Sequence, residues 1–194
     1  MTIEAGYVGL IPLERTRRIF DAVGGRAKLS TFWNGAVADR LLDDAHARIV
    51  ERALSVFQAR GWETGVEVSY SEYGERGSID ILAARRSASA IAVSEVKSDF
   101  GSLEETNRVL DAKERLGPRI AERVFGFRPR TVGRLLILPD QSTLRRVINE
   151  HERTMVSVYP ARGRDVRRWL RDPAGPIRGI WFLSEVALRD LGSA

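Results

Sequence analysis

Three charged residues lie in two neighbouring apolar segments near the middle of the chain. Asp80 lies in the segment 77–82, and Glu95 and Lys97 lie in the segment 92–97. Side chains alternate across a strand, so we expect Glu95 and Lys97 on one face, roughly 6.6 Å apart along it. Charges within an apolar strand are costly unless something pairs with them. If the two segments pair through the short turn between them, Asp80 comes close to Glu95.

This pair of carboxylates predicts a cation site. Two carboxylates in a partly buried site repel, and one is driven neutral unless a cation lies between them. A hard divalent metal is such a cation, because it prefers carboxylate oxygens. Lys97 then faces the same pocket, where it can hold a scissile phosphate or help to deprotonate a metal-bound water, whose pKa the metal lowers. The chemistry that this arrangement favours is hydrolysis of phosphodiester bonds.

The composition restricts which metal the site can hold. The chain has no cysteine, which excludes disulfides, thiolate metal sites and cysteine nucleophiles. Only His46 and His151 could supply imidazole, so a histidine-rich zinc site is excluded as well. The remaining ligands are oxygens, which favour Mg²⁺, Mn²⁺ or Ca²⁺.

A structural interpretation of the same residues stays open. Glu-x-Lys alone is a weak signal, because any amphipathic strand can show it, and a cross-strand ion pair would explain it. The apolar neighbours Ile91, Val93 and Val96 argue against a fully solvated strand.

The elements that must position these residues follow from hydrophobic periodicity. We expect helices over 13–23, 39–60, 103–124, 142–153 and 163–170, with a last helical turn or two over 184–191. We expect strands over 26–33, 66–70, 78–84, 90–97, 134–138, 155–159 and 180–183, the second, third and fourth forming an antiparallel meander. The sequence predicts an α/β fold, with residues 1–25 as an N-terminal helical leader and 26–194 as one domain.

The charge pattern indicates a polyanionic partner. Residues 1–100 hold 13 Lys+Arg and 14 Asp+Glu, whereas residues 101–194 hold 18 and 12. Segment 145–171 contributes eight arginines, with Tyr159 and Trp169 interleaved, and this is typical of a surface that binds a nucleic-acid backbone. An Arg-rich composition throughout and an ordinary solvated helix face are the alternatives. Candidates for backbone contacts here are Arg164, Arg167 and Arg168.

The spacing of Asp80, Glu95 and Lys97 resembles the PD-(D/E)XK nuclease superfamily, which includes restriction endonucleases. Segment 74–80 is similar to the longer form found in actinobacterial proteins of this type, often regulators, and the similarity covers about residues 26–172. The resemblance implies a restriction-endonuclease-like core, a mixed sheet of four to five strands flanked by helices. It also implies Mg²⁺ (or Mn²⁺) held by Asp80, Glu95 and the carbonyl of Val96. Ile79 replaces the proline of the family's name, and no helix-turn-helix is visible.

Further candidates follow from this resemblance. Resolvase-like members add a glutamate from the preceding helix, for which Glu51 is the natural choice, although it lies roughly 130° from the apolar stripe of its helix. The helix after the site often supplies a basic group to the phosphate, which suggests Arg108 and Lys113. Arg76 and Ser98, which flank the two segments, are additional candidates for contacts to nucleic acid. His46 is expected to be a part-buried histidine and His151 a surface residue.

We therefore expect a metal-dependent endonuclease that acts on DNA. One rival is a non-catalytic DNA-binding or regulatory protein on the same fold, and another is a protein-interaction partner in a defence or toxin-antitoxin system. Many members of the superfamily dimerise to cut both strands, so a homodimer is compatible with the resemblance. The absence of cysteine fits a cytoplasmic location, and neither a membrane span nor a secretory signal is expected.

Overall fold

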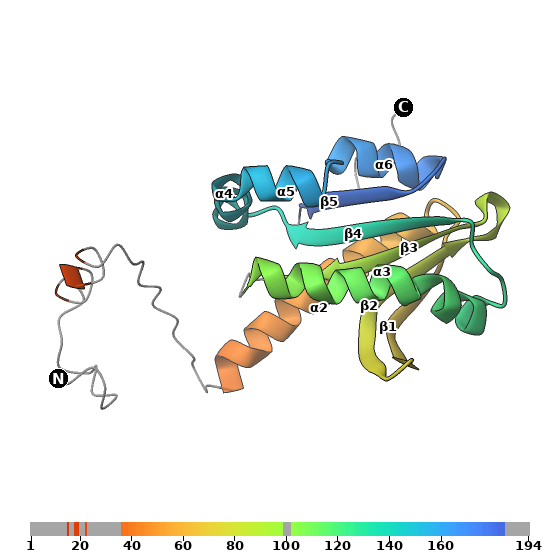
Figure 1. Ribbon diagram of the computed structural model, residues 1–194, viewed down its shortest axis with the longest axis horizontal. Coiled ribbons are helices and arrows are strands. Elements are labelled where there is room, and N and C mark those ends of the chain that lie inside the picture. Colours follow the sequence, from red (N-terminus) through yellow and green to blue (C-terminus); the bar gives the residue numbers. More distant parts are fainter. Residues whose placement is uncertain (1–14, 16–17, 20–21, 23–35, 99–101, 185–194) are drawn as a thin grey trace. The chain divides into compact units, whose positions relative to one another are not determined.

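The computed structural model describes residues 15, 18–19, 22, 36–98 and 102–184 (Figure 1). The chain divides into two compact units, residues 1–38 and 39–194, and the sheet belongs to the second. The expected strand over 26–33 and the helical turns after 184 lie outside the described residues. The expected helix over 13–23 is described at only four positions, all of them helical.

One five-stranded mixed sheet forms the centre of the second unit, in the order β1-β2-β3-β4-β5. Strands β1 and β2 pair antiparallel, as do β2 and β3, whereas β4 runs parallel to β3 and β5 parallel to β4. The sheet is therefore an antiparallel meander continued by two parallel strands. The strand bounds are β1 Glu63–Glu72, β2 Glu75–Arg85, β3 Ala90–Val96, β4 Thr131–Pro139 and β5 Ile177–Leu183.

Helices cover both faces of this sheet. Side chains of α2 and α6 share one hydrophobic cluster with the strands, and side chains of α3 to α5 form the clusters on the other face. Figure 1 shows α3 running across the sheet. The helix bounds are α2 Ala36–Gln58, α3 Leu103–Phe125, α4 Ser142–Glu150, α5 Glu152–Val158 and α6 Gly163–Arg171. None of the described helices has both the length and the apolar character needed to cross a bilayer.

Strand β3 is buried along its whole length, which makes it the strand on which any charge is most costly. Its residues alternate between the two layers: Ile91 and Val93 pack in the cluster with α3, and Ala92 and Val96 pack in the cluster with α2 and α6. Glu95 has the parity of Ile91 and Val93, so it faces α3. A carboxylate in this position requires a partner from that helix.

The structure confirms most of the expected elements and overturns one. The α/β class, the five strands and the meander are as expected, with ends that differ by a few residues. The strand expected over 155–159 is wrong, because α5 occupies this stretch as far as Val158. Met155 and Tyr159 are both buried and stand one helical turn apart, whereas Val156 is exposed. The apolar residues of this stretch therefore follow a helical spacing.

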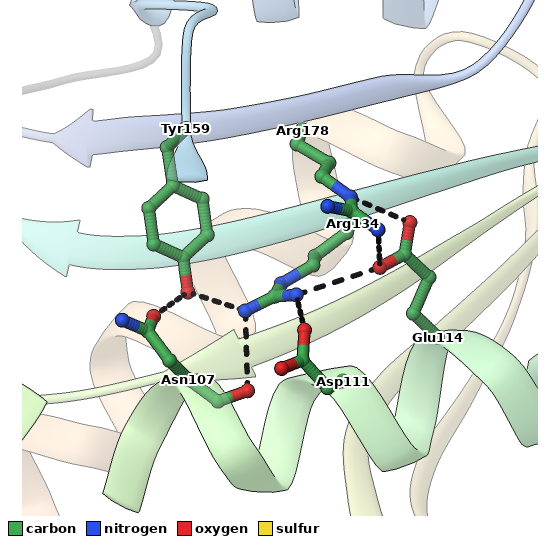
Figure 2. Close-up of polar contacts among 6 residues, drawn as sticks. All are labelled: Asn107, Asp111, Glu114, Arg134, Tyr159 and Arg178. Carbon is green, nitrogen blue, oxygen red and sulfur yellow. Dashed lines mark hydrogen bonds and ion pairs between the residues drawn. The ribbon is translucent and has the colours of Figure 1, made fainter. Parts of the chain in front are cut away.

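A buried arginine joins β4 to α3 (Figure 2). Arg134 is fully buried, and its guanidinium pairs with Asp111 and with Glu114, the latter at 3.4 Å. It also donates to the Asn107 carbonyl at 3.2 Å and to the Tyr159 hydroxyl at 3.2 Å. Glu114 is held in turn by Arg178 of β5 at 2.9 Å. The network supplies the hydrogen bonds and opposite charges that a buried cation requires.

A glycine allows α3 to lie close to β3. A Cβ added at Gly117 would stand 2.7 Å from a methyl carbon of Val93, a distance that real Cβ atoms do not show. The helix therefore approaches the strand more closely at this point than any larger residue permits. The position lies one turn beyond Lys113, whose side chain reaches the carboxylates described below.

We predict that Gly117→Ala destabilises the protein by about 1–3 kcal/mol, the usual cost of overpacking. In an ordinary helix position the same change would stabilise by up to about 1 kcal/mol, so the sign is diagnostic. The control is Gly163→Ala in α6, where an added Cβ meets its nearest atom at 3.6 Å. Urea unfolding of the three proteins measures the difference, and a Gly117→Ala protein at least as stable as wild type would contradict the close approach.

We also predict that Arg134→Ala costs about 3–5 kcal/mol, because it empties a buried site and removes a networked cation. The exposed ion pair of Arg146 with Glu150, 3.8 Å apart, supplies the comparison. Arg146→Ala is expected to cost less than about 1 kcal/mol. Equal losses in chemical denaturation would show that the Arg134 network carries little of the stability.

Candidate functional site

The three residues singled out by the sequence meet where β2 and β3 stop pairing. The last paired residues of this ladder are Ile81 and Ser94. Beyond this pair, the side chain of Asp80 replaces a backbone acceptor, because its Oδ2 accepts a hydrogen bond of 2.7 Å from the backbone N–H of Val96. One oxygen of Asp80 therefore has a structural role at the strand end. The other, Oδ1, faces Lys113.

A lysine from α3 lies between the two carboxylates. The Lys113 ammonium pairs with Glu95 Oε2 and lies 3.6 Å from Asp80 Oδ1. The Lys97 ammonium lies 2.9 Å from Glu95 Oε1. The side chains of Glu95 and Lys113 are each 5% exposed, Asp80 is 13% exposed and Lys97 is 38% exposed. Asp80, Glu95, Lys97 and Lys113, the carboxylate–lysine cluster, thus have one solvent-facing member, Lys97.

The electrostatics of Asp80 reflect both its burial and its neighbour. Burial raises the pKa of Asp80, and the negative charge of Glu95 raises it further. Lys113, the Val96 N–H and His46 act in the opposite direction without cancelling the rise. The two carboxylates therefore repel as the sequence suggested, and the cation that lies between them in this structure is an ammonium group of the chain itself.

The pKa of Lys97 decides between its two expected roles. Burial lowers the pKa of Lys97, but its hydrogen bond to Glu95 and the charges of Glu95 and Asp80 outweigh burial and raise it above the ordinary value. Such an ammonium keeps its proton at neutral pH. Lys97 is therefore suited to hold an anionic group rather than to accept a proton.

The donor set has the chemistry of a magnesium site. Mg²⁺ is commonly bound by only one or two carboxylates, with water and substrate phosphates completing its shell. Asp80 and Glu95 supply two carboxylates that already converge on one cation. Among the residues that the structure describes, no group of three or more His, Asp or Glu side chains is arranged to hold a metal. The residues fit a magnesium ion held by two acids, and they do not form a richer cage.

Glu51 is not brought into this group. Its side chain is exposed on α2, beside Arg48, Ser55 and the end of β5. The α2 residue whose charge acts on Asp80 is instead His46, which is partly buried.

The expected nucleic-acid contacts fall into two groups. Lys113 is buried in the carboxylate–lysine cluster and is not available to solvent. Arg108 is exposed but forms a two-fold contact with Glu105 of its own helix. The others lie at the surface or partly exposed; they are Arg76, Ser98, Arg164, Arg167 and Arg168.

Sequence reasoning missed the role of Lys113, although a signal was available. Thr106, Leu110, Lys113, Gly117 and Ile120 recur at spacings of three and four along α3, and all five are buried. Lys113 therefore occupies the apolar stripe of its helix, where a lysine requires a buried acid as its partner. Arg134 was missed as well, because the strand expected over 134–138 was given no role for its first residue.

Comparison with known proteins identifies no relative. No family model, no curated protein and no solved structure matches the chain.

We predict that the two lysines of the cluster differ sharply in their effect on stability. Lys113→Met leaves two buried carboxylates without their central cation and is expected to cost about 3–5 kcal/mol. Lys97→Met removes a partly exposed partner and is expected to cost about 1 kcal/mol or less. Thermal and urea unfolding at pH 7 measure both values. Similar losses for the two variants would mean that Lys113 does not hold the carboxylates together.

Proposed function

We propose that this protein is a metal-dependent nuclease with a restriction-endonuclease-like core, and that it hydrolyses phosphodiester bonds in DNA. The observation that carries the proposal is the convergence of Asp80 and Glu95, from neighbouring strands, on one cation position with Lys97 beside it. The order of elements supports it, because a helix, a meander, a second helix and a parallel strand give the mixed sheet that the resemblance implies.

The cofactor would be Mg²⁺ or Mn²⁺. Asp80 and Glu95 would hold it, and the resemblance adds the carbonyl of Val96. When bound, the metal supplies Lewis-acid polarisation of a phosphoryl oxygen and lowers the pKa of a coordinated water. Lys113 pairs with the same carboxylates, so metal and ammonium compete for them.

The chain's own residues would supply contacts to the phosphate and to the nucleic-acid backbone. Lys97, protonated and partly exposed, is placed to bind the non-bridging oxygens of a phosphate beside the carboxylates. Charge-assisted hydrogen bonds from such an ammonium also stabilise the negative charge that develops during displacement at phosphorus. The basic C-terminal half would hold the backbone of the nucleic acid. DNA as substrate, a homodimer and a cytoplasmic location remain predictions from the sequence.

One observation favours a second candidate, a non-catalytic DNA-binding or regulatory protein on the same fold. Lys97 and Lys113 supply two positive charges to two carboxylates, so the cluster is electrically balanced without a metal. In that case Asp80, Glu95 and Lys113 serve only to fix α3 to the sheet.

A plasmid-nicking assay with Mg²⁺ or Mn²⁺ separates these two functions. We expect wild type to nick DNA, and Asp80→Asn and Lys97→Met to lose about 10²–10⁴-fold of the rate, as expected for removal of a catalytic group. Both variants should keep salt-dependent DNA binding, because their phosphate contacts elsewhere are intact. Glu150→Gln, a change of the same kind at an exposed acid, is the control and should leave the rate unchanged.

The outcomes separate cleanly. Wild type that binds DNA without nicking it, in either metal, would contradict the nuclease and support the non-catalytic candidate. Nicking that persists in Asp80→Asn would show that the activity belongs to another site or to a contaminant.

A further inference from the structure

A second site, lined by none of the residues of the carboxylate–lysine cluster, lies at the carboxyl ends of β4 and β5. A cavity of about 760 Å³ opens where β4 and β5 end, and α2, α4 and the start of α6 complete its walls. This volume is within the range of small-molecule sites, roughly 300–1,000 Å³. The carboxyl ends of parallel strands are also where α/β sheets commonly bind ligands.

The walls of this cavity, the arginine pocket, are strongly basic. Among the described lining residues the acids are Asp140 and Glu152, and Asp140 is already paired with Arg145. Against these two acids stand six arginines, namely Arg52, Arg60, Arg145, Arg162, Arg164 and Arg167. The described lining residues therefore carry a formal excess of positive charge.

Two arginines of the pocket hold buried N–H groups without a partner. These are the Nε of Arg60 and one Nη of Arg162. The other end of Arg60 is fixed, because its Nη1 donates to the Val56 carbonyl at 3.1 Å. A buried donor without an acceptor costs roughly 1–3 kcal/mol, more if charged, so both guanidiniums lack part of the hydrogen bonding that they require.

The crowding of cations is also visible in their electrostatics. Burial lowers the pKa of Arg60, and the positive charges of Arg171 and Arg167 lower it further. The start of α6 adds to the positive potential, because Gly163 at its first turn lines the pocket and helix N-termini attract anions. In the absence of a ligand, these groups repel one another.

The shape of the pocket indicates what kind of anion it accepts. Guanidinium groups match the oxygens of phosphate with paired hydrogen bonds, and several guanidiniums require more than one negative charge. Apolar side chains also line the pocket, namely Ile148, Trp181 and Phe182, and the Arg145 guanidinium lies 4.3 Å from the Phe182 ring centre. A ligand that satisfies both kinds of lining residue carries clustered phosphates and a flat, less polar part.

We propose that the arginine pocket binds a nucleotide through two or more phosphate groups. The nucleotide is either a free nucleoside polyphosphate or the phosphorylated end of a nucleic-acid strand, since both present the same chemistry. This binding does not use the carboxylate–lysine cluster, so Asp80→Asn is expected to retain it.

Calorimetric titration of the full chain tests the proposal with four probes: pyrophosphate, a nucleoside triphosphate, and a short oligonucleotide with and without a 5′-phosphate. We expect pyrophosphate and at least one phosphorylated nucleotide to bind. Tighter binding of the triphosphate identifies a free nucleotide as the ligand, and a preference for the 5′-phosphorylated over the 5′-hydroxyl strand identifies a strand end.

The matched variants are Arg167→Gln and Arg168→Gln, neighbours on α6 of which only Arg167 lines the pocket. Arg167→Gln should weaken binding about tenfold or more, the effect of one charged hydrogen bond, and Arg168→Gln should change it little. Arg167→Gln should also raise the melting temperature of the unliganded protein slightly, because it relieves repulsion with Arg60. This second readout establishes that the variant is folded.

Three results with these four probes would overturn the proposal. These are no binding of any phosphorylated probe, an equal loss in Arg167→Gln and Arg168→Gln, and an oligonucleotide that binds equally with and without its phosphate while pyrophosphate does not bind. A polyglutamate peptide that binds as tightly as the triphosphate would also overturn it, and would assign the pocket to an acidic protein segment.

Discussion

Two buried cations hold α3 against the sheet, one supplied by the helix and the other by a strand. The helix provides Lys113 to the carboxylates of Asp80 and Glu95, whereas β4 provides Arg134 to Asp111 and Glu114 of the helix. Each charge is too costly to bury alone, so each fixes the register of α3 on the strands. The close approach of α3 to β3 at Gly117 allows both sets of ion pairs to form. The position of Glu95 relative to Asp80 depends on these ion pairs.

This constraint links stability and the proposed activity. The carboxylates that would bind a metal are the same groups that compensate Lys113, so metal binding must replace an internal ion pair. The cluster is compensated by the chain's own lysines, and a bound metal would take the place of one of these cations. To bind, Mg²⁺ would have to lose part of its hydration and displace Lys113 from the carboxylates. We therefore expect its affinity to be lower than at a site whose acids have no internal cation.

Much of this site could be predicted from the sequence, and the exceptions have physical causes. The strands bearing Asp80, Glu95 and Lys97 follow from apolar segments and turns, and their pairing follows from the short connection. Lys113 was expected to contact a phosphate, because the helix after such a site often supplies a basic group, although the spacing of its helix places it in the buried stripe. The arginine pocket is lined by segments more than a hundred residues apart, from Arg52 to Arg167. A local sequence pattern cannot predict that such distant segments lie together. The strand expected over 155–159 was wrong because five residues are too few to distinguish a strand from a helical turn by their apolar pattern.

The most direct test of the central claim is a crystal structure of the protein grown with Mn²⁺, with data collected at the manganese absorption edge. The account predicts an anomalous peak bound by Asp80 and Glu95, with the Lys113 ammonium displaced from between them. Data without a peak at this pair, and with Lys113 still in contact with both carboxylates, would contradict it. The cluster would then be an internal ion-pair network that holds the helix to the sheet.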